Sequence, residues 1–362
     1  MKKERFLKYD IIRIVAIFLV LLCHVSAFMV LEFPNPSGLE FIIGNIPNGL
    51  CRACIPLFVM LSGALLLNEN KPFDTKKFYK KSLLWMALLL VFWLIFYAFF
   101  YTLILPSLMN QPIDWKEFGD YILTFKGSDC PHLWYMFMVC GLYLMTPVFR
   151  LFVKRANVKY IIGIVVVALI YTFLMKTLNV FVVNSETNKT AFTDFATKFH
   201  LEPVGGYVAY FLLGWLFDNF EIKKPCRIVI YAIGLLSVIG IILTVQFTIK
   251  DIPTIRNFTS ADLSLPVILY GSATFLFITN ACKDKKHTSK MLTFLSNTAF
   301  GVYAIHIVIQ ELFTRVWLTP YKLNVHPALY FFIIYIIVIV LSYLIAFVIS
   351  KIKYVRKVIH IK

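Results

Sequence analysis

Charged residues are scarce in this chain of 362 residues. They make up 15% of the sequence, against about 25% in an average soluble domain. Hydrophobic residues make up 60%, so a globule in water could not cover its surface with polar groups. This scarcity excludes a disordered chain and an ordinary soluble enzyme, and it indicates a protein that is solvated by lipid.

Cysteines and common catalytic signatures are also sparse. The seven cysteines are scattered, mostly within apolar runs, which excludes a secreted disulfide scaffold. Cys51 and Cys54 have CxxC spacing, but no second pair accompanies them, so no metal site is expected. The sequence also lacks a Walker motif, a GxGxxG fingerprint and an HExxH zinc motif.

Acidic residues number only 19 against 36 Lys and Arg, which leaves a net charge of +17. Such an excess is typical either of nucleic-acid binding or of the positive-inside bias of membrane proteins. Here the basic residues concentrate in alternate connections between apolar runs. The amino-terminal tail carries four and the second connection five, whereas the first connection has none. The alternation favours membrane topology, so no nucleic-acid partner is expected.

What the sequence has in abundance is apolar runs of membrane-spanning length. They predict an all-α, polytopic membrane protein with about ten transmembrane helices and both termini in the cytoplasm. We expect one domain over residues 1–362, without a soluble appendage, in the cell membrane and in contact with lipid. The ten predicted spans are 9–31, 46–67, 82–105, 131–152, 158–181, 203–219, 226–247, 262–281, 294–315 and 327–350.

The first span contains three ionisable residues, Asp10, Arg13 and His24. A charge at mid-helix costs about 2.5–3.5 kcal/mol, so its presence requires a reason. Eleven helical steps leave Arg13 and His24 about 20° apart around the axis and roughly 16 Å apart along it. Asp10, three residues before Arg13, is placed to pair with it. Alternatively, Arg13 extends to the lipid headgroups and His24 forms a hydrogen bond with a neighbouring helix. Because both residues lie on one helix face, a functional role for that face inside the bundle is an equal hypothesis.

Two further candidates lie in the ninth span. His306 is about 20 Å from the cytoplasmic end at helical rise, and His24 is about 22 Å from its own, so the two imidazoles lie at comparable depth. A packing role and a chemical role both remain open for His306. Glu311 lies near the outer end of this span, where the charge rule does not favour an acid.

Basic residues supply the remaining candidates. Arg52 lies near the outer start of the second span. Lys77 and Lys80 belong to the densest basic cluster of the sequence, in the second connection. That cluster is explained either by the positive-inside bias or by docking of a polyanion such as a nucleotide phosphate.

Four motifs, in order, give the chain a resemblance to acyltransferase family 3, a family of integral membrane acyltransferases with about ten helices. Asp10-Ile-Ile-Arg13, followed by ten residues and His24, is similar to the family's first signature. Pro56–Gly63, preceded by Arg52, resembles its second-helix motif. His132-Leu-Trp-Tyr135 resembles the fourth-helix opening of its short, single-domain branch, and Ser296–His306 resembles its late Ser-x-Gly-x-Tyr-x-x-His stretch.

The resemblance implies transfer of an acyl group, usually acetyl from acetyl-CoA, to a hydroxyl of a cell-surface glycan or its lipid-linked precursor. In the family the first-helix histidine and the arginine of the same motif are essential, which falls here on His24 and Arg13. Many relatives carry Arg-x-x-Arg after the second helix for donor use. Lys77-Phe-Tyr-Lys80 occupies that place in this chain. The positive charge is therefore kept, but the lysines lack the planar guanidinium that binds a phosphate through two N–H groups.

The predicted function is therefore O-acyl transfer, with acetyl-CoA or succinyl-CoA as donor substrate and no metal. Neutral His24 would remove the proton of the acceptor hydroxyl, with the donor phosphates near Arg13 and the loop lysines. Asp10, Arg52, His306 and Glu311 are possible catalytic or substrate contacts. The alternative is a transporter or exporter of a polysaccharide or small amino acid, as suggested for some relatives.

Overall fold

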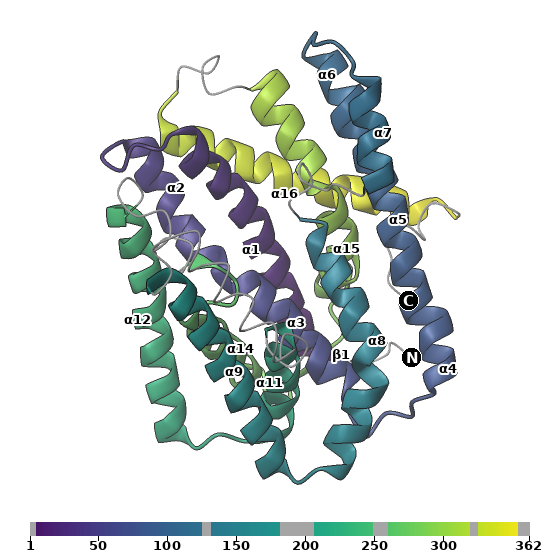
Figure 1. Cartoon of the computed structure of the whole chain (residues 1–362), viewed down its shortest axis with the longest axis vertical. Coiled ribbons are helices and arrows are strands. Elements are labelled where there is room, and N and C mark those ends of the chain that lie inside the picture. Colours follow the sequence, from purple (N-terminus) through teal and green to yellow (C-terminus); the bar gives the residue numbers. More distant parts are fainter. Residues whose placement is uncertain (1–4, 125–131, 182–205, 249–259, 319–324, 354–362) are drawn as a thin grey trace. The chain divides into compact units, whose positions relative to one another are not determined.

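A computed structural model describes residues 5–124, 132–181, 206–248, 260–318 and 325–353 (Figure 1). In lipid a backbone must satisfy its own hydrogen bonds, which a helix does within one segment. Seven described helical segments are long and apolar enough to cross a membrane, and two shorter apolar helices accompany them. The chain is therefore an all-α, multi-pass membrane protein. The predicted cytoplasmic tails, and the start of the predicted span 203–219, lie largely outside the described residues.

Side-chain exposure agrees with solvation by lipid. On α12 (Lys224–Thr248), Leu235, Leu236 and Phe247 are each more than 60% exposed. On α16 (Pro327–Lys351), Phe332 and Val340 are more than half exposed. Faces of this kind are unfavourable in water and are expected where helices contact lipid tails.

The chain divides into two compact units. Unit 1 comprises Met1–Glu69 and Arg150–Ser296, and unit 2 comprises Asn70–Phe149 and Asn297–Lys362. The boundary falls within α8 (Trp134–Arg155) and within α15 (Lys290–Glu311).

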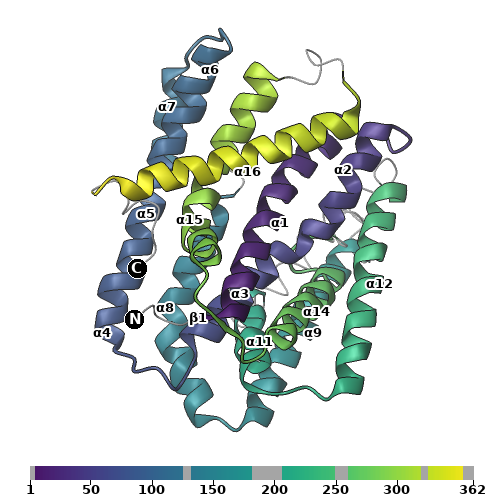
Figure 2. The ribbon, with the colours of Figure 1, turned by 180° about the vertical axis from the view of Figure 1, so that it is seen from behind.

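In unit 1, α1 (Leu7–Glu32) packs against α2 (Leu39–Leu50) and α3 (Cys54–Leu66), and α12 packs against α14 (Leu265–Ala281) and α2 (Figures 1 and 2). The helix α11 (Tyr207–Asn219) packs against α3 and α9 (Val158–Phe181). A two-residue strand β1 (Arg5–Phe6) pairs antiparallel with β2 (Lys286–His287).

The crossing of α3 and α11 depends on two glycines. A Cβ on Gly63 would meet the backbone oxygen of Phe211, and a Cβ on Gly214 would meet the backbone oxygen of Met60. Each glycine therefore admits the backbone of the other helix. Small residues allow this close approach between helices in membranes, where burial in lipid gives no hydrophobic driving force.

The second predicted span is longer than expected and is interrupted. The helical segment begins at Leu39 rather than at residue 46, and a 3₁₀ turn, η1 (Cys51–Ala53), separates α2 from α3. Pro47 and Pro56 lie on either side of this turn. Such turns within helices often mark functional sites. The prediction that Arg52 lies near the start of the span was therefore wrong: Arg52 lies in the turn near its middle.

Unit 2 contains a long segment composed of α4 (Thr75–Phe78), η2 (Tyr79–Leu83), α5 (Leu84–Phe99), η3 (Phe100–Ile104) and α6 (Leu105–Leu108), where η2 and η3 are π-helical. A further helix, α7 (Trp115–Thr124), packs against α5 and lies outside the ten predicted spans. The unit also includes most of α8 and α15, the π-helical turn η5 (Leu312–Trp317), and α16.

Candidate functional site

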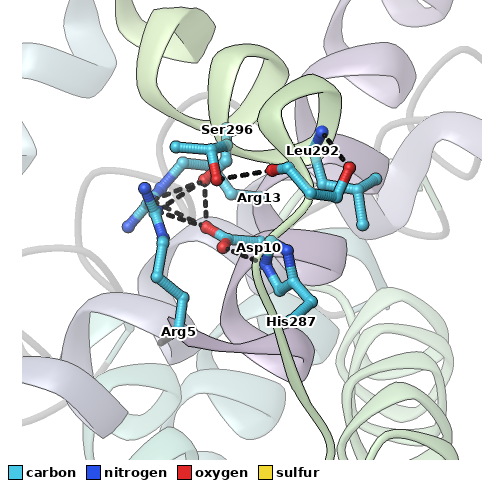
Figure 3. Close-up of polar contacts among 8 residues, drawn as sticks. Arg5, Asp10, Arg13, His287, Leu292 and Ser296 are labelled. Atoms are coloured by element: carbon cyan, nitrogen blue, oxygen red, sulfur yellow. Dashed lines mark hydrogen bonds and ion pairs between the residues drawn. The ribbon is translucent and has the colours of Figure 1, made fainter. Parts of the chain in front are cut away.

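A buried carboxylate organises the first candidate site. Asp10 is 1% exposed, and its Oδ1 accepts hydrogen bonds from Arg5 and from the hydroxyl of Ser296, each at 2.5 Å (Figure 3). Its Oδ2 lies 2.8 Å from Nε2 of His287. The predicted pairing with Arg13 is present at 3.9 Å. Arg5, Asp10, Arg13, His287 and Ser296 are called the Asp10 cluster below.

The local structure explains why these residues meet. The register of the two strands places Arg5 opposite His287, just before α1 and just before α15. Asp10 lies in the first turn of α1, where a carboxylate interacts favourably with the helix dipole. Ser296 lies two turns into α15, accepts from Arg13 at 2.8 Å and donates to Asp10, so it connects the two helices.

The Asp10 cluster has an excess of positive charge. Two guanidinium groups face one carboxylate, and the Arg5 and Arg13 side chains retain 28% and 27% of their exposure. Within the cluster, two guanidinium groups therefore share one carboxylate. Partly exposed guanidinium groups with excess charge suit recognition of an anionic group such as phosphate.

A cavity of about 260 Å³ lies beside the start of α1, and its charges are balanced. Lys8 lies 2.5 Å from Asp218, and Lys283 lies 3.1 Å from Glu221. Arg227, the third cation of the cavity wall, donates to the side chain of Asn280. Three acidic residues, Asp218, Glu221 and Asp284, offset its three cations. The formal charges of the residues that line this cavity therefore cancel, whereas those of the Asp10 cluster do not.

A second site lies farther along α1, around His24. The helix is continuous from Leu7 to Glu32, so Arg13 and His24 lie on one rigid element, as predicted. The side chain of Asn48 on α2 donates to the hydroxyl of Ser26 at 3.3 Å. Arg52 donates to the backbone oxygen of Asn48 at 3.1 Å and also to its side-chain oxygen. This chain of hydrogen bonds fixes Arg52 relative to α1.

A guanidinium group, three thiols and a carboxylate lie around His24. His24 is half-buried and interacts electrostatically with Cys23 and Arg52. Arg52 in turn lies within electrostatic range of a group comprising Cys23, Cys51, Cys54 and Asp262. The carboxylate of Asp262 accepts a hydrogen bond from Tyr207. The structure therefore brings together His24 and Arg52, which no sequence pattern had linked. The His24 cluster below means His24, Arg52, Cys23, Cys51, Cys54 and Asp262.

His306 belongs to a different group, within unit 2. It is fully buried, its Nδ1 lies 2.6 Å from the backbone oxygen of Tyr303, and its ring lies 5.4 Å from that of His132. Tyr303 donates to the backbone oxygen of His132 at 2.5 Å, and the Tyr97 ring lies 4.9 Å from the His132 ring. Both a packing role and a chemical role stay open for His306. Its neighbour His132, 3% exposed, was noted only within a motif.

The other candidates of unit 2 have simpler surroundings. Glu311 forms an ion pair of 2.5 Å with Arg315, one turn later on the same segment. That pair gives the acid a counter-charge, and a catalytic or substrate role for Glu311 stays a prediction. Lys77 and Lys80 are exposed at the start of the long helical segment of unit 2. They are accessible to a polyanion, and their role stays a prediction.

Sequence reasoning missed several members of these sites. Arg5 had been counted only as a topology determinant, His287 had not been singled out, and Ser296 had appeared only as the first residue of a motif. His287 and Ser296 are 277 and 286 residues from Asp10 along the chain, so no local pattern links them to it. Arg5 is only five residues away, and its approach to Asp10 could have been considered from the sequence. Cys23 could have been noticed as a thiol directly before His24.

Among the residues that the structure describes, no three or more His, Cys, Asp or Glu side chains form a group that could hold a metal ion. A family model described as an acyltransferase domain, that of acyltransferase family 3, matches residues 6–347. No curated protein and no solved structure matches the chain. The matched range includes both the Asp10 cluster, apart from Arg5, and the His24 cluster.

Proposed function

The chain belongs to acyltransferase family 3, and from this membership we propose that it moves an acetyl or succinyl group from acyl-CoA to a hydroxyl of a cell-surface glycan or a lipid-linked precursor. It does so as a single domain of about ten transmembrane helices in the plasma membrane, with both termini in the cytoplasm. The donor then enters from the cytoplasmic side.

The observation that carries this proposal is the arrangement of two clusters along α1. The Asp10 cluster, with excess positive charge, lies near the start of the helix, and His24 lies roughly 16 Å farther along it. The extended arm between the phosphates and the thioester of CoA has a comparable length. Phosphates held beside Arg13 would therefore leave the thioester near His24.

Each predicted residue then has a role in the proposed reaction. Arg13 binds donor phosphate, with Asp10 and Ser296 holding its guanidinium in place. Lys77 and Lys80 attract the nucleotide part of the donor from solution, as exposed ammonium groups do. His24 takes the proton of the acceptor hydroxyl so that the oxygen can attack the acyl carbonyl carbon.

Arg52 is suited to a different part of the same reaction. Charge develops on the carbonyl oxygen during acyl transfer, and a fixed guanidinium beside the reacting group stabilises it. Hydrogen bonds to Asn48 already orient Arg52, so little reorganisation is needed during the reaction. His306 remains a candidate substrate contact, and its meeting with His24 stays a prediction.

The test is transfer of labelled acetyl from acetyl-CoA to extracted envelope glycans by the full-length protein in lipid. Wild type should transfer the label, and His24→Ala should lower the rate about 10²–10⁴-fold, the usual contribution of a general base. His326→Ala is the matched control, because His326 is an exposed residue that caps α16. Succinyl-CoA is tested in parallel.

Two results would contradict the proposal. One is full transfer by His24→Ala at normal expression, which removes His24 from the chemistry. The other is uptake or export of a substrate by wild type with no consumption of either acyl-CoA, which would identify a transporter instead.

A further inference from the structure

Three thiols meet beside His24. Cys23 lies directly before His24 on α1, and its sulfur interacts with those of Cys51 and Cys54, which flank Arg52 in the second span. The turn that holds Cys51 packs against α1, and the hydrogen bond from Asn48 to Ser26 joins the two segments within one helical turn of Cys23. Cys51 also donates to the backbone oxygen of Asn48 at 3.0 Å, which fixes its sulfur in the turn. The family match and the proposed roles of His24 and Arg52 leave these thiols without an assigned function.

The three thiols differ in accessibility. Cys51 is 0% exposed and Cys54 is 4% exposed, whereas Cys23 is half-buried. Cys23 is therefore the member of the group that a substrate can approach. Cysteines that react as nucleophiles lie in partly exposed, electropositive surroundings, while fully buried ones are inert.

A cation and an imidazole lie beside the sulfur of Cys23. The guanidinium of Arg52 and the imidazole of His24 both interact with its sulfur. The buried thiol of Cys54 is a weak donor toward the same sulfur. A thiolate beside a fixed cation and an imidazole is the common arrangement of an activated nucleophile.

We propose that Cys23 is the first acceptor of the acyl group and carries it as a thioester before the glycan hydroxyl receives it. This inference rests on the proposed function, since acyl-CoA supplies the acyl group. It deepens that function by dividing the transfer into two steps at one site.

The first step exchanges one thioester for another. The proton of the Cys23 thiol passes to His24, and the thiolate attacks the carbonyl carbon of acyl-CoA. A bond forms between that carbon and the sulfur of Cys23, the bond to the CoA sulfur breaks, and CoA leaves with the proton from His24. Nothing is oxidised or reduced, and the energy of the thioester is retained.

The second step releases the acyl group to the acceptor. His24 takes the proton of the glycan hydroxyl, and the oxygen attacks the carbonyl carbon held by Cys23. The carbon–sulfur bond breaks, and the Cys23 sulfur recovers a proton from His24. CoA can therefore leave before the acceptor arrives, so the two substrates need not occupy the site together.

Isotope exchange tests this inference without an acceptor. The full-length protein in lipid is incubated with acetyl-CoA and labelled free CoA, with a phosphine reductant to keep the thiols free. A thioester on the protein predicts that label enters acetyl-CoA, because the first step runs in both directions. Cys23→Ala should lose the exchange to the level of a protein-free sample, whereas Cys226→Ala, at an exposed position of α12, should retain it.

Direct detection of the thioester completes the test. With labelled acetyl-CoA, wild type should hold label that neutral hydroxylamine releases and that maps to the peptide containing Cys23. Cys23→Ser, which preserves side-chain size, should hold no label that hydroxylamine releases. Equal melting temperatures of the variants and wild type show that folding is not the cause.

The outcomes separate this inference from the proposed function. Glycan acylation by wild type with no CoA exchange, or acylation by Cys23→Ala at the wild-type rate, overturns the thioester and leaves the acyltransferase intact. Exchange and label on Cys23 without transfer to any glycan supports the thioester and rejects the proposed acceptor. Absence of both exchange and transfer in wild type rejects both.

Discussion

Replacing Asp10 by asparagine tests whether one carboxylate holds the Asp10 cluster together. The asparagine side chain keeps the size and one acceptor oxygen of the native aspartate, so the hydrogen bonds from Arg5 and Ser296 can persist in neutral form. What disappears is the negative charge between Arg5 and Arg13. The two guanidinium groups then lose the carboxylate with which both are paired.

The expected cost follows from distance and exposure. Opposite charges about 4 Å apart, the separation of Arg13 and Asp10, attract by about 4 kcal/mol at an effective dielectric constant of 20. Removing one partner from a fully buried pair costs about 3–5 kcal/mol. Because Arg5 and Arg13 are 28% and 27% exposed, water screens part of their charge, and about 2–3 kcal/mol of destabilisation is expected.

Thermal unfolding in lipid nanodiscs, followed by tryptophan fluorescence at one scan rate, measures this effect. Glu221→Gln is the control, because it removes a charge from a pair whose side chains are 53% and 66% exposed and so costs under about 1 kcal/mol. The reasoning is refuted if Asp10→Asn melts no lower than Glu221→Gln.

Two further predictions concern the helix crossing and the loop lysines. Gly63→Ala should lower the melting temperature and the rate of transfer, since overpacking costs about 1–3 kcal/mol and its Cβ would meet backbone. Gly163→Ala on α9 has open space and should gain up to about 1 kcal/mol, so equal melting of the two variants would contradict the proposed packing. The double substitution Lys77→Ala, Lys80→Ala should raise KM for acyl-CoA, most clearly at low salt, with an unchanged melting temperature because both side chains are exposed. An unchanged KM would remove these lysines from donor capture.

Patterns between near neighbours in the sequence were reliable guides. The apolar runs predicted helices that the structure contains, and seven of the segments meet the requirements of a membrane span. The spacing of three residues predicted the approach of Asp10 to Arg13, which is present at 3.9 Å. Both inferences depend only on helical geometry, which is the same wherever the helix packs.

Two other features depended on the tertiary structure, namely the bend in the second span and a contact between distant helices. Its apolar pattern placed Arg52 near the start of a helix, but the 3₁₀ turn at Cys51–Ala53 places it beside His24 and Cys23. Likewise, the sequence could not show that His132 faces His306, because their contact joins helices that are separated by more than 150 residues.

The sequence by itself therefore determined the class of protein, its family resemblance and the joint position of Arg13 and His24 on one helix. Only the tertiary structure decided which residues surround them. Arg5, His287 and Ser296 reach Asp10 through strand pairing and the start of α15, and three cysteines reach one another through the packing of α1 on the second span. The physical reason is that helical periodicity is a local property of the chain, whereas a site is formed by side chains from distant segments whose meeting depends on the packing of whole helices.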